Sequence, residues 1–485
     1  MNNKEKFYIT TTLPYVNAEP HAGFAMEIIE ADVLARFNRQ LGKDVFFNTG
    51  TDEHGLKLFR KAQELGMDVQ DYVDQQAENF KSLKEILNIS YDNFIRTTDK
   101  HHIVAAQEFW KRCEANGDIY KKSYKTKYCV GCESEKTDSD LVDGKCCDHP
   151  NMEIEIIEEE NYFFRFSKYQ KPLLDLYEKN PEFVLPKHRL KEIKNFVEGG
   201  LEDFSISRLK NKMPWGIAVP GDEDQVIYVW FDALINYIST LGWPNDMEKF
   251  NSFWPGVQIA GKDNLRFQSA MWQSMLMSAG IEPSKQIFIN GFITVDGQKM
   301  SKSTGNVISP AEMVEKFGVD GTRYLLLSGG NFGEDMDITW ERMTEKFNAD
   351  LANGLGNLVS RVVKLYEKTD KDFSMFSDYN EVVTKDDQYS FFSKEEAFQI
   401  QYMRISNVLD VCMSNVKILN RKIEDSKPWE LEKSNKDLFE KVMSELVKSL
   451  SALSIVLFPL LPETSQKIKT ALETKVAEPL FQRIK

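Results

Sequence analysis

The stretch FYITTTLPYVNAEPHAGF, residues 7–24, is the starting point for interpreting this chain. Its first six residues are apolar or β-branched and predict a strand, and the Pro- and Asn-rich residues after them predict a turn. A helix is expected from Ala22 to Leu41, where apolar side chains recur at three- and four-residue spacing before Gly42. Asp44 to Asn48 predicts a second short strand. Strand, loop, helix and strand in this order open a parallel α/β sheet.

Two loops of this unit are expected to bind ligands, because ligands of parallel sheets lie beyond the carboxyl ends of the strands. The loops hold residues 14–23 and 49–55. In the first, Gly23 lets a ligand approach the start of the helix closely, and His21 can donate to a phosphate oxygen. A His and a Gly at a helix start are also typical of a plain N-terminal turn, so this pattern alone does not establish a phosphate site.

The alternation of strands and helices stops near residue 116, where clustered cysteines and an acidic stretch predict an inserted module. The sheet is expected to resume with the apolar runs Val226–Phe231, Val257–Ala260 and Gln286–Asn290. Beyond residue 345, long helical patterns predict a helix bundle over residues 346–368, 393–423 and 436–458. The expected fold class is α/β with an insertion and a C-terminal α-helical domain, divided into residues 1–115, 116–225, 226–290, 291–345 and 346–485.

The composition is that of a globular protein, with 42% hydrophobic residues and 61 Lys and Arg against 75 Asp and Glu, a net charge of −14. This acidic balance argues against a protein that coats nucleic acid through bulk charge, and it is compatible with a local basic face. Apolar runs such as Ile455–Leu461 are far shorter than the roughly 18 residues that predict a membrane span. Because Met1–Lys6 is polar, no signal peptide is expected, and a cytoplasmic location is predicted.

Four of the six cysteines lie in one short segment, with the pattern Cys129-x2-Cys132 followed by Cys146, Cys147 and His149. Thiolates and an imidazole at this spacing predict a tetrahedral zinc site. Three Cys and one His leave no open coordination position, which favours a structural metal. Either Cys146 or Cys147 can supply the third thiolate, and the spacing does not choose between them.

A second phosphate-binding pattern lies late in the chain, in Lys299-Met300-Ser301-Lys302-Ser303. Its two lysines can bring ammonium groups to a polyphosphate and stabilise the charge that develops when an α-phosphorus is attacked. Two lysines on a solvated loop are the ordinary alternative. However, the five-residue string is the signature of class I aminoacyl-tRNA synthetases, and here it follows a His-x-Gly helix start. Together the two motifs make the chain resemble that class.

The chain is similar to the methionyl-tRNA synthetase family nearly from end to end. The similarity rests on residues 12–17 (TLPYVN), 50–55 (GTDEHG), 228–233 (YVWFDA) and 261–263 (GKD). It implies a Rossmann-type catalytic domain split by a connective domain with a zinc knuckle, a stem-contact segment with the Lys-Met-Ser-Lys-Ser loop, and an α-helical anticodon-binding domain. It also implies the reaction: methionine and Mg-ATP give methionyl-adenylate and pyrophosphate, and the methionyl group then passes to the 3′ end of tRNA(Met).

The resemblance also implies which residues act at each site. The implied catalytic residues are His21, Lys299 and Lys302. The implied methionine-binding residues are Leu13, Tyr15, Asp52, Trp230, Ala233, Leu234, Tyr237 and Gln268. The implied ATP-binding residues are His21, Gly23, Glu27, Gly261, Asp263 and Lys302. The implied metal ligands are Cys129, Cys132, Cys146 and His149, and the implied anticodon-reading residues are Asn357, Arg361, Pro428 and Trp429.

Elementary chemistry agrees with these assignments. An unbranched, polarizable thioether suits an aromatic-lined slot, and a carboxylate such as Asp52 can orient a buried ammonium. An exposed aromatic ring such as Trp429 can stack on an unpaired base. Catalysis of adenylate formation would rest on positioning and charge stabilisation, without a protein nucleophile.

Two positions depart from the family pattern. Phe24 stands where the phosphate motif usually has His or Asn, and the loss of one such donor costs about 2.7–4 kcal/mol of transition-state stabilisation by analogy with an oxyanion hole. Gln268 stands where the family commonly has a His at the methionine sulfur, and its amide can still donate there. These departures motivate the alternative of a non-catalytic tRNA-binding paralogue, against which the retained Asp52, Lys299 and Lys302 argue.

A class I synthetase for another small hydrophobic amino acid is a further alternative, but the insertion is too compact for the large editing domain that such enzymes usually carry. The expected partners are ATP, L-methionine and tRNA(Met), with one structural Zn²⁺ and with Mg²⁺ bound to ATP. A monomer is expected, since no oligonucleotide-binding module follows the helical domain. The adjacent pair His101-His102 indicates a solvated helix face rather than a pair of ligands.

Overall fold

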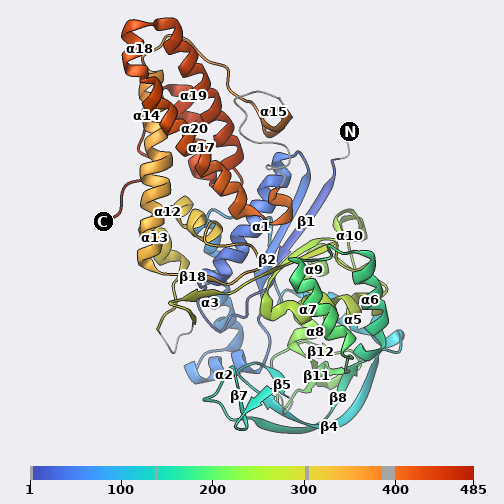
Figure 1. The fold of residues 1–485 in the computed structure, drawn as a ribbon. Helices are drawn as coiled ribbons and strands as arrows, with labels where there is room; N and C mark the ends of the chain where they lie inside the picture. The colour runs from blue at the N-terminus through green and yellow to red at the C-terminus, as the bar shows by residue number, and fades with distance from the viewer. Residues whose placement is uncertain (1–3, 137–139, 301–304, 385–398) are drawn as a thin grey trace.

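A computed structural model of the chain describes residues 4–136, 140–300, 305–384 and 399–485. A parallel sheet lies at its centre, and two further parts extend from the sheet in different directions (Figure 1). The C-terminal helices, coloured orange to red, form an elongated bundle at the top of the view. The inserted segment, in cyan and green, lies at the bottom right. None of the described helices combines the length and the apolar character needed to cross a membrane.

The central sheet is parallel throughout and has the strand order of a Rossmann-type fold. In spatial order its strands are β3 (Asn93–Arg96), β2 (Asp44–Thr51), β1 (Lys6–Thr11), β14 (Val257–Gly261), β15 (Gln286–Asn290) and β9 (Val184–Leu185). The predicted strands at residues 7–12, 44–48, 257–260 and 286–290 are therefore confirmed, with small shifts at their ends. The direction of chain progression reverses between β1 and β14, and ligands bind at such switch points.

Helix α1 (Ala22–Gln40) follows β1 and confirms the helix predicted from Ala22 to Leu41. It is buried along most of its length because it packs between the sheet and the C-terminal helices. Gly42 lies just beyond it with φ of 82°, a left-handed conformation that glycine adopts without strain and that commonly ends a helix.

The prediction that Val226–Phe231 belongs to the central sheet is wrong. Residues Asp222–Ile227 do form a strand, β13, but it pairs antiparallel with β11 (Ser207–Leu209) and β12 (Ala218–Val219) in a separate small sheet. The chain then turns into helix α8 (Val229–Leu234), which is buried on nearly all sides. A short apolar run reads alike as a buried strand or a buried helix, so its sequence alone could not distinguish the two.

The insertion begins after helix α5 (Lys100–Ala115). Its long strands β4 (Ile119–Cys129) and β8 (Glu155–Phe164) pair antiparallel and reach toward the cysteine cluster. Smaller elements complete it: β5 (Ser134–Lys136), β6 (Leu141–Val142), β7 (Lys145–Cys146), η2 (Phe166–Tyr169), α6 (Gln170–Lys179), α7 (Lys187–Glu198) and β10 (Phe204–Ser205). The helices around the sheet are α2 (Leu56–Leu65), α3 (Val69–Lys81), α4 (Leu83–Ile86), α9 (Asn236–Ser239), α10 (Met247–Phe253), η3 (Lys262–Asn264), η4 (Phe267–Met271) and α11 (Trp272–Ser278).

After the sheet, β16 (Ile293–Val295), β17 (Gln298–Lys299) and β18 (Met336–Ile338) form a small sheet beside α12 (Pro310–Leu327), whose helical course is interrupted at Gly318. The bundle consists of α13 (Trp340–Lys346), η5 (Phe347–Gly356), α14 (Asn357–Tyr366), α15 (Tyr379–Thr384), η6 (Gln399–Tyr402), α17 (Ile405–Ser426), α18 (Pro428–Ser434), α19 (Lys436–Leu457) and α20 (Pro462–Thr474). Residue 345, the expected domain boundary, lies inside α13. The first part of the predicted 393–423 helix lies outside the described residues.

Candidate functional site

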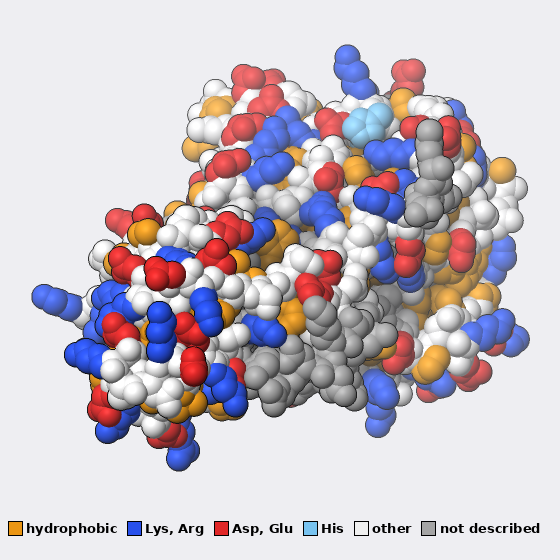
Figure 2. Space-filling view, turned by 90° about the horizontal axis from the view of Figure 1, so that it is seen from above, with side chains coloured by type: hydrophobic (Ala, Val, Ile, Leu, Met, Phe, Trp, Pro, Cys, Tyr) orange, Lys and Arg blue, Asp and Glu red, His pale blue; other side chains and the backbone are white. Residues whose placement is uncertain are grey.

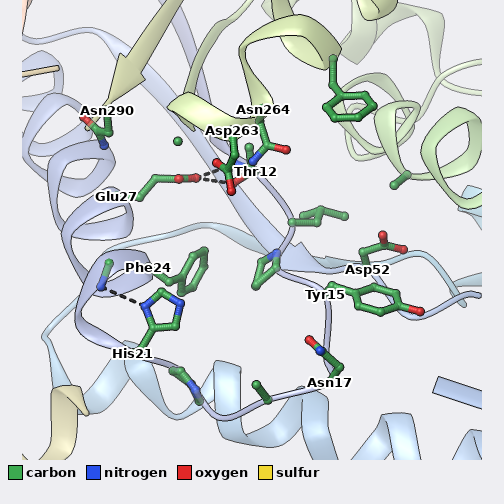
Figure 3. A pocket seen from close by; sticks show the side chains of 18 of the residues that line it. Thr12, Tyr15, Asn17, His21, Phe24, Glu27, Asp52, Asp263, Asn264 and Asn290 are labelled. Atoms are coloured by element: carbon green, nitrogen blue, oxygen red, sulfur yellow. Dashed lines mark hydrogen bonds between the residues drawn. The ribbon is translucent and has the colours of Figure 1, made fainter. Parts of the chain in front are cut away.

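A cavity of about 490 Å³ opens at the carboxyl ends of β1 and β14 (Figure 3). Its wall contains every described residue that the sequence assigned to the two small-molecule sites: Leu13, Tyr15, His21, Gly23, Glu27, Asp52, Trp230, Ala233, Leu234, Tyr237, Gly261, Asp263, Gln268 and Lys299. Lys302 lies outside the described residues. One cavity therefore holds residues from both halves of the sheet and from both sides of the insertion.

Backbone hydrogen bonds bring the loop after β1 against the end of β2. The Val16 N–H donates to the Asp52 carbonyl at 3.2 Å, and the Asp52 N–H donates to the Pro14 carbonyl at 3.0 Å. Tyr15 and Asp52 thereby become neighbours, although the chain between them includes the whole of α1. Both side chains lie at the right of the cavity in Figure 3.

Asp52 lies at the polar end of this cavity. Its side chain is buried, and its Oδ1 atom has no hydrogen-bond partner among the described residues. Burial raises the pKa of Asp52 well above the ordinary value, and the nearby carboxylates Asp232 and Glu133 raise it further. A carboxylate in such a place is stabilised by a cationic group that enters the cavity. Asp52 can therefore hold a positively charged part of a ligand.

Another part of the cavity wall is aromatic. Trp230 and Phe267 stack in parallel, with ring centroids 3.9 Å apart. Tyr237 is buried, and its hydroxyl oxygen accepts a hydrogen bond from the Gln268 side-chain amide. One N–H of Gln268 is therefore committed to Tyr237 and only the second remains for a ligand, while the Oε1 atom of Gln268 has no partner among the described residues. The slot suits an unbranched apolar side chain.

The start of α1 has the geometry of an anion site. The Nδ1 atom of His21 accepts a hydrogen bond from the Gly23 N–H at 3.1 Å (Figure 3). Desolvation by the surrounding protein lowers the pKa of His21 and outweighs the opposite effect of Asp263, and Lys299 lowers it further. A neutral ring that accepts at Nδ1 carries its proton on Nε2, which is then available to donate to an anion. Phe24 lies beside this position and packs edge-on against Phe80 of α3, with ring centroids 5.6 Å apart.

Glu27 lies one turn further along α1. Its Oε1 accepts hydrogen bonds from the Thr12 N–H at 2.8 Å and from the Thr12 hydroxyl at 2.6 Å (Figure 3). Burial raises the pKa of Glu27 to about 8. Asp263, just after β14, faces it across the switch point, so polar acceptors from both halves of the sheet line this side of the cavity. Lys299 is exposed at the rim, with its Nζ 4.8 Å from the centre of the Phe292 ring.

The predicted metal ligands also come together. The Sγ atoms of Cys129, Cys132 and Cys146 and a ring nitrogen of His149 all lie within 4.8 Å of one another. The Sγ atom of Cys132 is 3.4 Å from that of Cys146 and 3.2 Å from His149 Nδ1. Zn–S bonds of about 2.3 Å in a tetrahedron require ligand separations of about 3.8 Å, so this donor set fits zinc after small adjustments. Cys147 is exposed and directs its Sγ to the Asp140 carbonyl instead.

The chain is similar to known proteins over most of its length. It matches the family described as tRNA synthetases class I (M) over residues 7–155 and 140–363. A methionine–tRNA ligase of Thermotoga maritima is 40% identical over 470 residues, covering 96% of this chain and 74% of that protein. A second, from Clostridium acetobutylicum, is 42% identical over 485 residues, covering 98% and 74%. The chain belongs to the methionine–tRNA ligase family.

Solved structures of the methionine–tRNA ligase family share the fold. The Mycobacterium tuberculosis methionyl-tRNA synthetase in complex with methionyl-adenylate has a TM-score of 0.88 at 36% sequence identity, covering 96% of this chain and 93% of that one. The apo form of the same enzyme has a TM-score of 0.82 at 32% identity, covering 99% of both chains. The fold class and the family expected from the sequence are thus confirmed.

Glu133 is a residue of the cavity wall that the sequence did not predict. Glu133, next to Cys132 of the cysteine cluster, reaches from the insertion into the cavity of this methionine–tRNA ligase family member, where it is buried. It accepts hydrogen bonds from the Tyr15 hydroxyl at 2.9 Å and from the Lys57 N–H at the start of α2 at 2.6 Å. Its backbone is left-handed, with φ of 47°, an uncommon conformation outside glycine. Because Glu133 contacts residues remote in sequence, only its proximity to the cysteines could have indicated it.

Glycines allow this close approach of the insertion. Gly55 has φ of 118°, and a Cβ atom there would lie 2.5 Å from the Glu133 carboxylate. A Cβ atom on Gly131 would lie 2.5 Å from the His149 ring. The cysteine cluster therefore lies beside a segment that forms part of the cavity wall.

The predicted anticodon residues lie in the helical bundle. Asn357 and Arg361 line a second cavity, of about 410 Å³, between η5, α14 and α17. Arg361 forms an ion pair with Glu424 at 2.7 Å. Pro428 is buried at the start of α18, and Trp429 is 38% exposed. Figure 2, which looks down on this end of the molecule, shows acidic and basic side chains interspersed rather than a patch of one sign.

Proposed function

We propose that this chain is a methionine–tRNA ligase that activates L-methionine with Mg-ATP and transfers the methionyl group to the 3′ end of tRNA(Met). The observation that carries the proposal is the presence, in one cavity, of a buried Asp52 carboxylate oxygen that has no hydrogen-bond partner among the described residues and of an aromatic slot at Trp230 and Tyr237. These two features match the ammonium and the thioether of methionine. The N-terminus of α1, which suits a phosphate group, lines the same cavity, and this supports activation of the amino acid by a nucleotide.

In this proposal, Asp52 binds the methionine ammonium and leaves the carboxylate free to attack the α-phosphorus of ATP. The new carboxyl–phosphorus bond forms as the bond to the pyrophosphate oxygen breaks. His21 donates from Nε2 to a phosphate oxygen, and Lys299 and Lys302 add positive charge at the departing pyrophosphate. Gly23, Glu27, Gly261 and Asp263 form the rest of the nucleotide side of the cavity, and Mg²⁺ enters with ATP. The protein supplies position and charge rather than a nucleophile.

The metal of the Cys129, Cys132, Cys146 and His149 cluster is proposed to be zinc with a structural role. Bound zinc would supply four bonds that close the loop ahead of Glu133. In the helical bundle, Asn357, Arg361, Pro428 and Trp429 are proposed to read the anticodon, with the exposed Trp429 ring stacking on a base.

The test is methionine-dependent ATP–pyrophosphate exchange by the purified chain without tRNA, with leucine, isoleucine and cysteine as controls. Exchange with methionine alone is the expected result. It would also establish that Phe24 and Gln268 are compatible with catalysis. No exchange with any amino acid, from a folded chain that still binds tRNA, would instead identify a non-catalytic tRNA-binding paralogue.

A further inference from the structure

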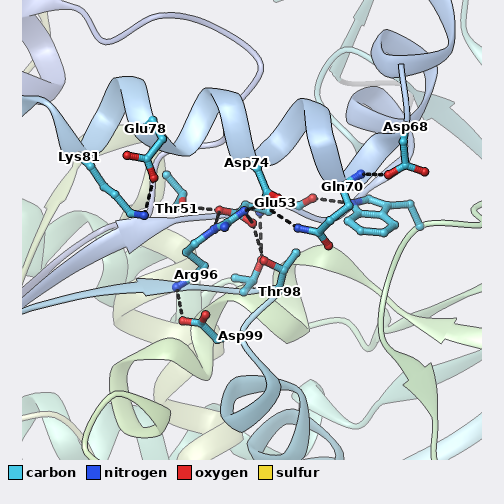
Figure 4. Close-up of polar contacts among 12 residues, drawn as sticks. Thr51, Glu53, Asp68, Gln70, Asp74, Glu78, Lys81, Arg96, Thr98 and Asp99 are labelled. Atoms are coloured by element: carbon cyan, nitrogen blue, oxygen red, sulfur yellow. Dashed lines mark hydrogen bonds and ion pairs between the residues drawn. The ribbon is translucent and has the colours of Figure 1, made fainter. Parts of the chain in front are cut away.

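Asp52 is followed by two buried residues, Glu53 and His54, that do not line the cavity but hold its polar end in place. The Glu53 carboxylate accepts two hydrogen bonds from Arg96, at 2.7 and 2.8 Å, and one from the Thr98 hydroxyl at 2.6 Å (Figure 4). This cluster anchors the loop to the neighbouring strand β3. Glu53 therefore fixes one side of the Asp52 loop to the edge of the central sheet.

His54 fixes the other side of the loop, and does so through helix α8. Its Nδ1 lies 2.6 Å from Oδ2 of Asp232, and the second oxygen of Asp232 lies 2.7 Å from Nε2 of His102 on α5. The Nδ1 atom of His102 lies 2.9 Å from the Ser239 hydroxyl on α9. A continuous chain of hydrogen bonds thus joins the Asp52 loop to three helices.

The hydrogen-bonded side chains of this network are shielded from water. His54 is 4% exposed, and Asp232 and His102 are 0% exposed. Burial opposes the ionisation of Asp232, but His54 and His102 outweigh that effect and lower its pKa. An ionised carboxylate only accepts, so His54 donates from Nδ1 and His102 donates from Nε2. Short, charge-assisted hydrogen bonds of this kind are stronger than neutral ones, and their geometry is specific.

The sequence had placed His101 and His102 together on a solvated helix face. That prediction holds for His101, which is exposed, and is wrong for His102. Successive residues of a helix point about 100° apart, so adjacent histidines lie on different faces. Asp232 stands between Trp230 and Ala233 in α8, and both of those residues line the cavity. The hydrogen bond from His102 is therefore made to the helix that carries Trp230 of the aromatic slot.

We infer that Asp232, held between His54 and His102, is a positioning residue. It sets the distance between Asp52 and helix α8, and thereby the fit of methionine between them. The inference rests on the proposed function, since it assumes that methionine occupies this cavity. Asp232, His54 and His102 do not touch the ligand. They act by keeping the Asp52 carboxylate and the slot for the methionine side chain at a fixed distance and orientation relative to each other.

The experiment measures equilibrium binding of methionine and, separately, of ATP to the full chain, with four variants. His102→Leu removes the donor to Asp232, and His102→Gln retains an amide N–H close to the position of Nε2. His101→Leu, at the adjacent exposed histidine, is the matched control. Ser239→Ala removes the outermost hydrogen bond, to His102, together with a longer one to the Asn236 carbonyl at 3.4 Å.

His102→Leu is expected to weaken methionine binding about tenfold or more, because it leaves one oxygen of a buried carboxylate unpaired. ATP affinity should stay within about twofold, since the nucleotide side of the cavity lies on α1 and β14. His102→Gln should restore methionine affinity to near that of the wild type, and His101→Leu should have no effect. A merely structural role of His102 would reduce both affinities, and the glutamine would not rescue methionine selectively.

Three results would overturn the inference: wild-type methionine affinity in His102→Leu, equal losses for methionine and ATP, or a glutamine variant as weak as the leucine variant. If His102→Leu does not fold, Ser239→Ala provides the test. It is expected to bind methionine about threefold more weakly. Unchanged methionine binding in Ser239→Ala would then contradict the inference. Methionine binding does not require adenylation. A wild-type chain that binds methionine without pyrophosphate exchange contradicts the proposed function alone, and one that does not bind methionine contradicts both.

Discussion

Asp32 of α1 and Arg323 of α12 form a fully buried ion pair, with 2.8 Å between Oδ2 and Nη2 and no exposed area on either side chain. Arg323 also donates to the carbonyls of Leu460 and Pro459, at 2.9 and 3.1 Å, in the loop that leads into α20. The pair therefore connects the central sheet, the segment after it and the helical bundle.

Replacement of Asp32 by asparagine is expected to lower the free energy of unfolding by about 3–5 kcal/mol, because it leaves the Arg323 guanidinium buried without its counter-charge. Urea unfolding at neutral pH measures this. Asp44→Asn, at the exposed pair with Lys6, is the matched control and should cost less than about 1 kcal/mol. Equal losses in the two variants would contradict the role given to the buried pair.

The same pair predicts a pH dependence. Burial opposes the ionisation of Asp32, but Arg323 and Arg36 outweigh it and hold the pKa of this carboxyl below its ordinary value. The contribution of the pair is therefore complete above the unfolded-state pKa of about 3.9 and is lost as the pH falls through the lower folded-state pKa. The stability difference between wild type and Asp32→Asn should shrink in acid. A difference that is constant down to the acid transition would exclude this explanation.

Methionine binding is expected to release a proton. Burial, with Asp232 and Glu133, keeps the pKa of Asp52 raised in the free cavity, whereas a bound ammonium requires the ionised carboxylate. The affinity for methionine should therefore rise with pH up to the raised pKa of Asp52. Calorimetry in two buffers with different ionisation enthalpies counts the protons. Glu133, whose pKa burial raises to about 7, lies in the same cavity, so Glu133→Gln should retain the release if Asp52 is its source.

Cys146, rather than Cys147, is expected to bind the metal. Cys146→Ser should lose most of the bound zinc, and Cys147→Ser should retain about one ion per chain, because the Cys147 thiol points to the Asp140 carbonyl and away from the cluster. Zinc content by mass spectrometry measures both. Loss of zinc from Cys147→Ser with retention in Cys146→Ser would reverse the assignment. Metal removal should also weaken methionine binding, since Cys132 and Glu133 line the cavity.

Trp429→Ala is expected to raise the KM for tRNA about tenfold, in line with the roughly 1–3 kcal/mol that stacking on one base contributes, and to leave pyrophosphate exchange unchanged. Phe458→Ala, which removes another aromatic ring of similar exposure in the bundle, is the control and should leave both unchanged. Aminoacylation as a function of tRNA concentration provides the measurement. A parallel loss of exchange in Trp429→Ala would show damage beyond the anticodon site.

Local sequence was sufficient for much of the catalytic domain. β1, α1 and β2 follow from residue spacing and from Gly42, because a strand or helix that buries one face repeats its apolar side chains at a fixed period. The cysteine cluster was predicted from the spacing of Cys129, Cys132 and His149, which left Cys146 and Cys147 as alternatives for the third thiolate. The residues assigned to the cavity wall were implied by the resemblance of short motifs to one family, and several of these motifs lie at the ends of strands.

The path of residues 226–231, the role of Glu133 and the buried His102 could not be predicted in this way. His54 and Asp232 are 178 residues apart, and Asp232 and His102 are 130 apart. Contacts over such distances depend on how loops close and helices pack, and no local period records them. The motifs, through their resemblance to one family, therefore identified the residues expected to meet the substrates, whereas tertiary packing alone brought together the side chains that hold them in position.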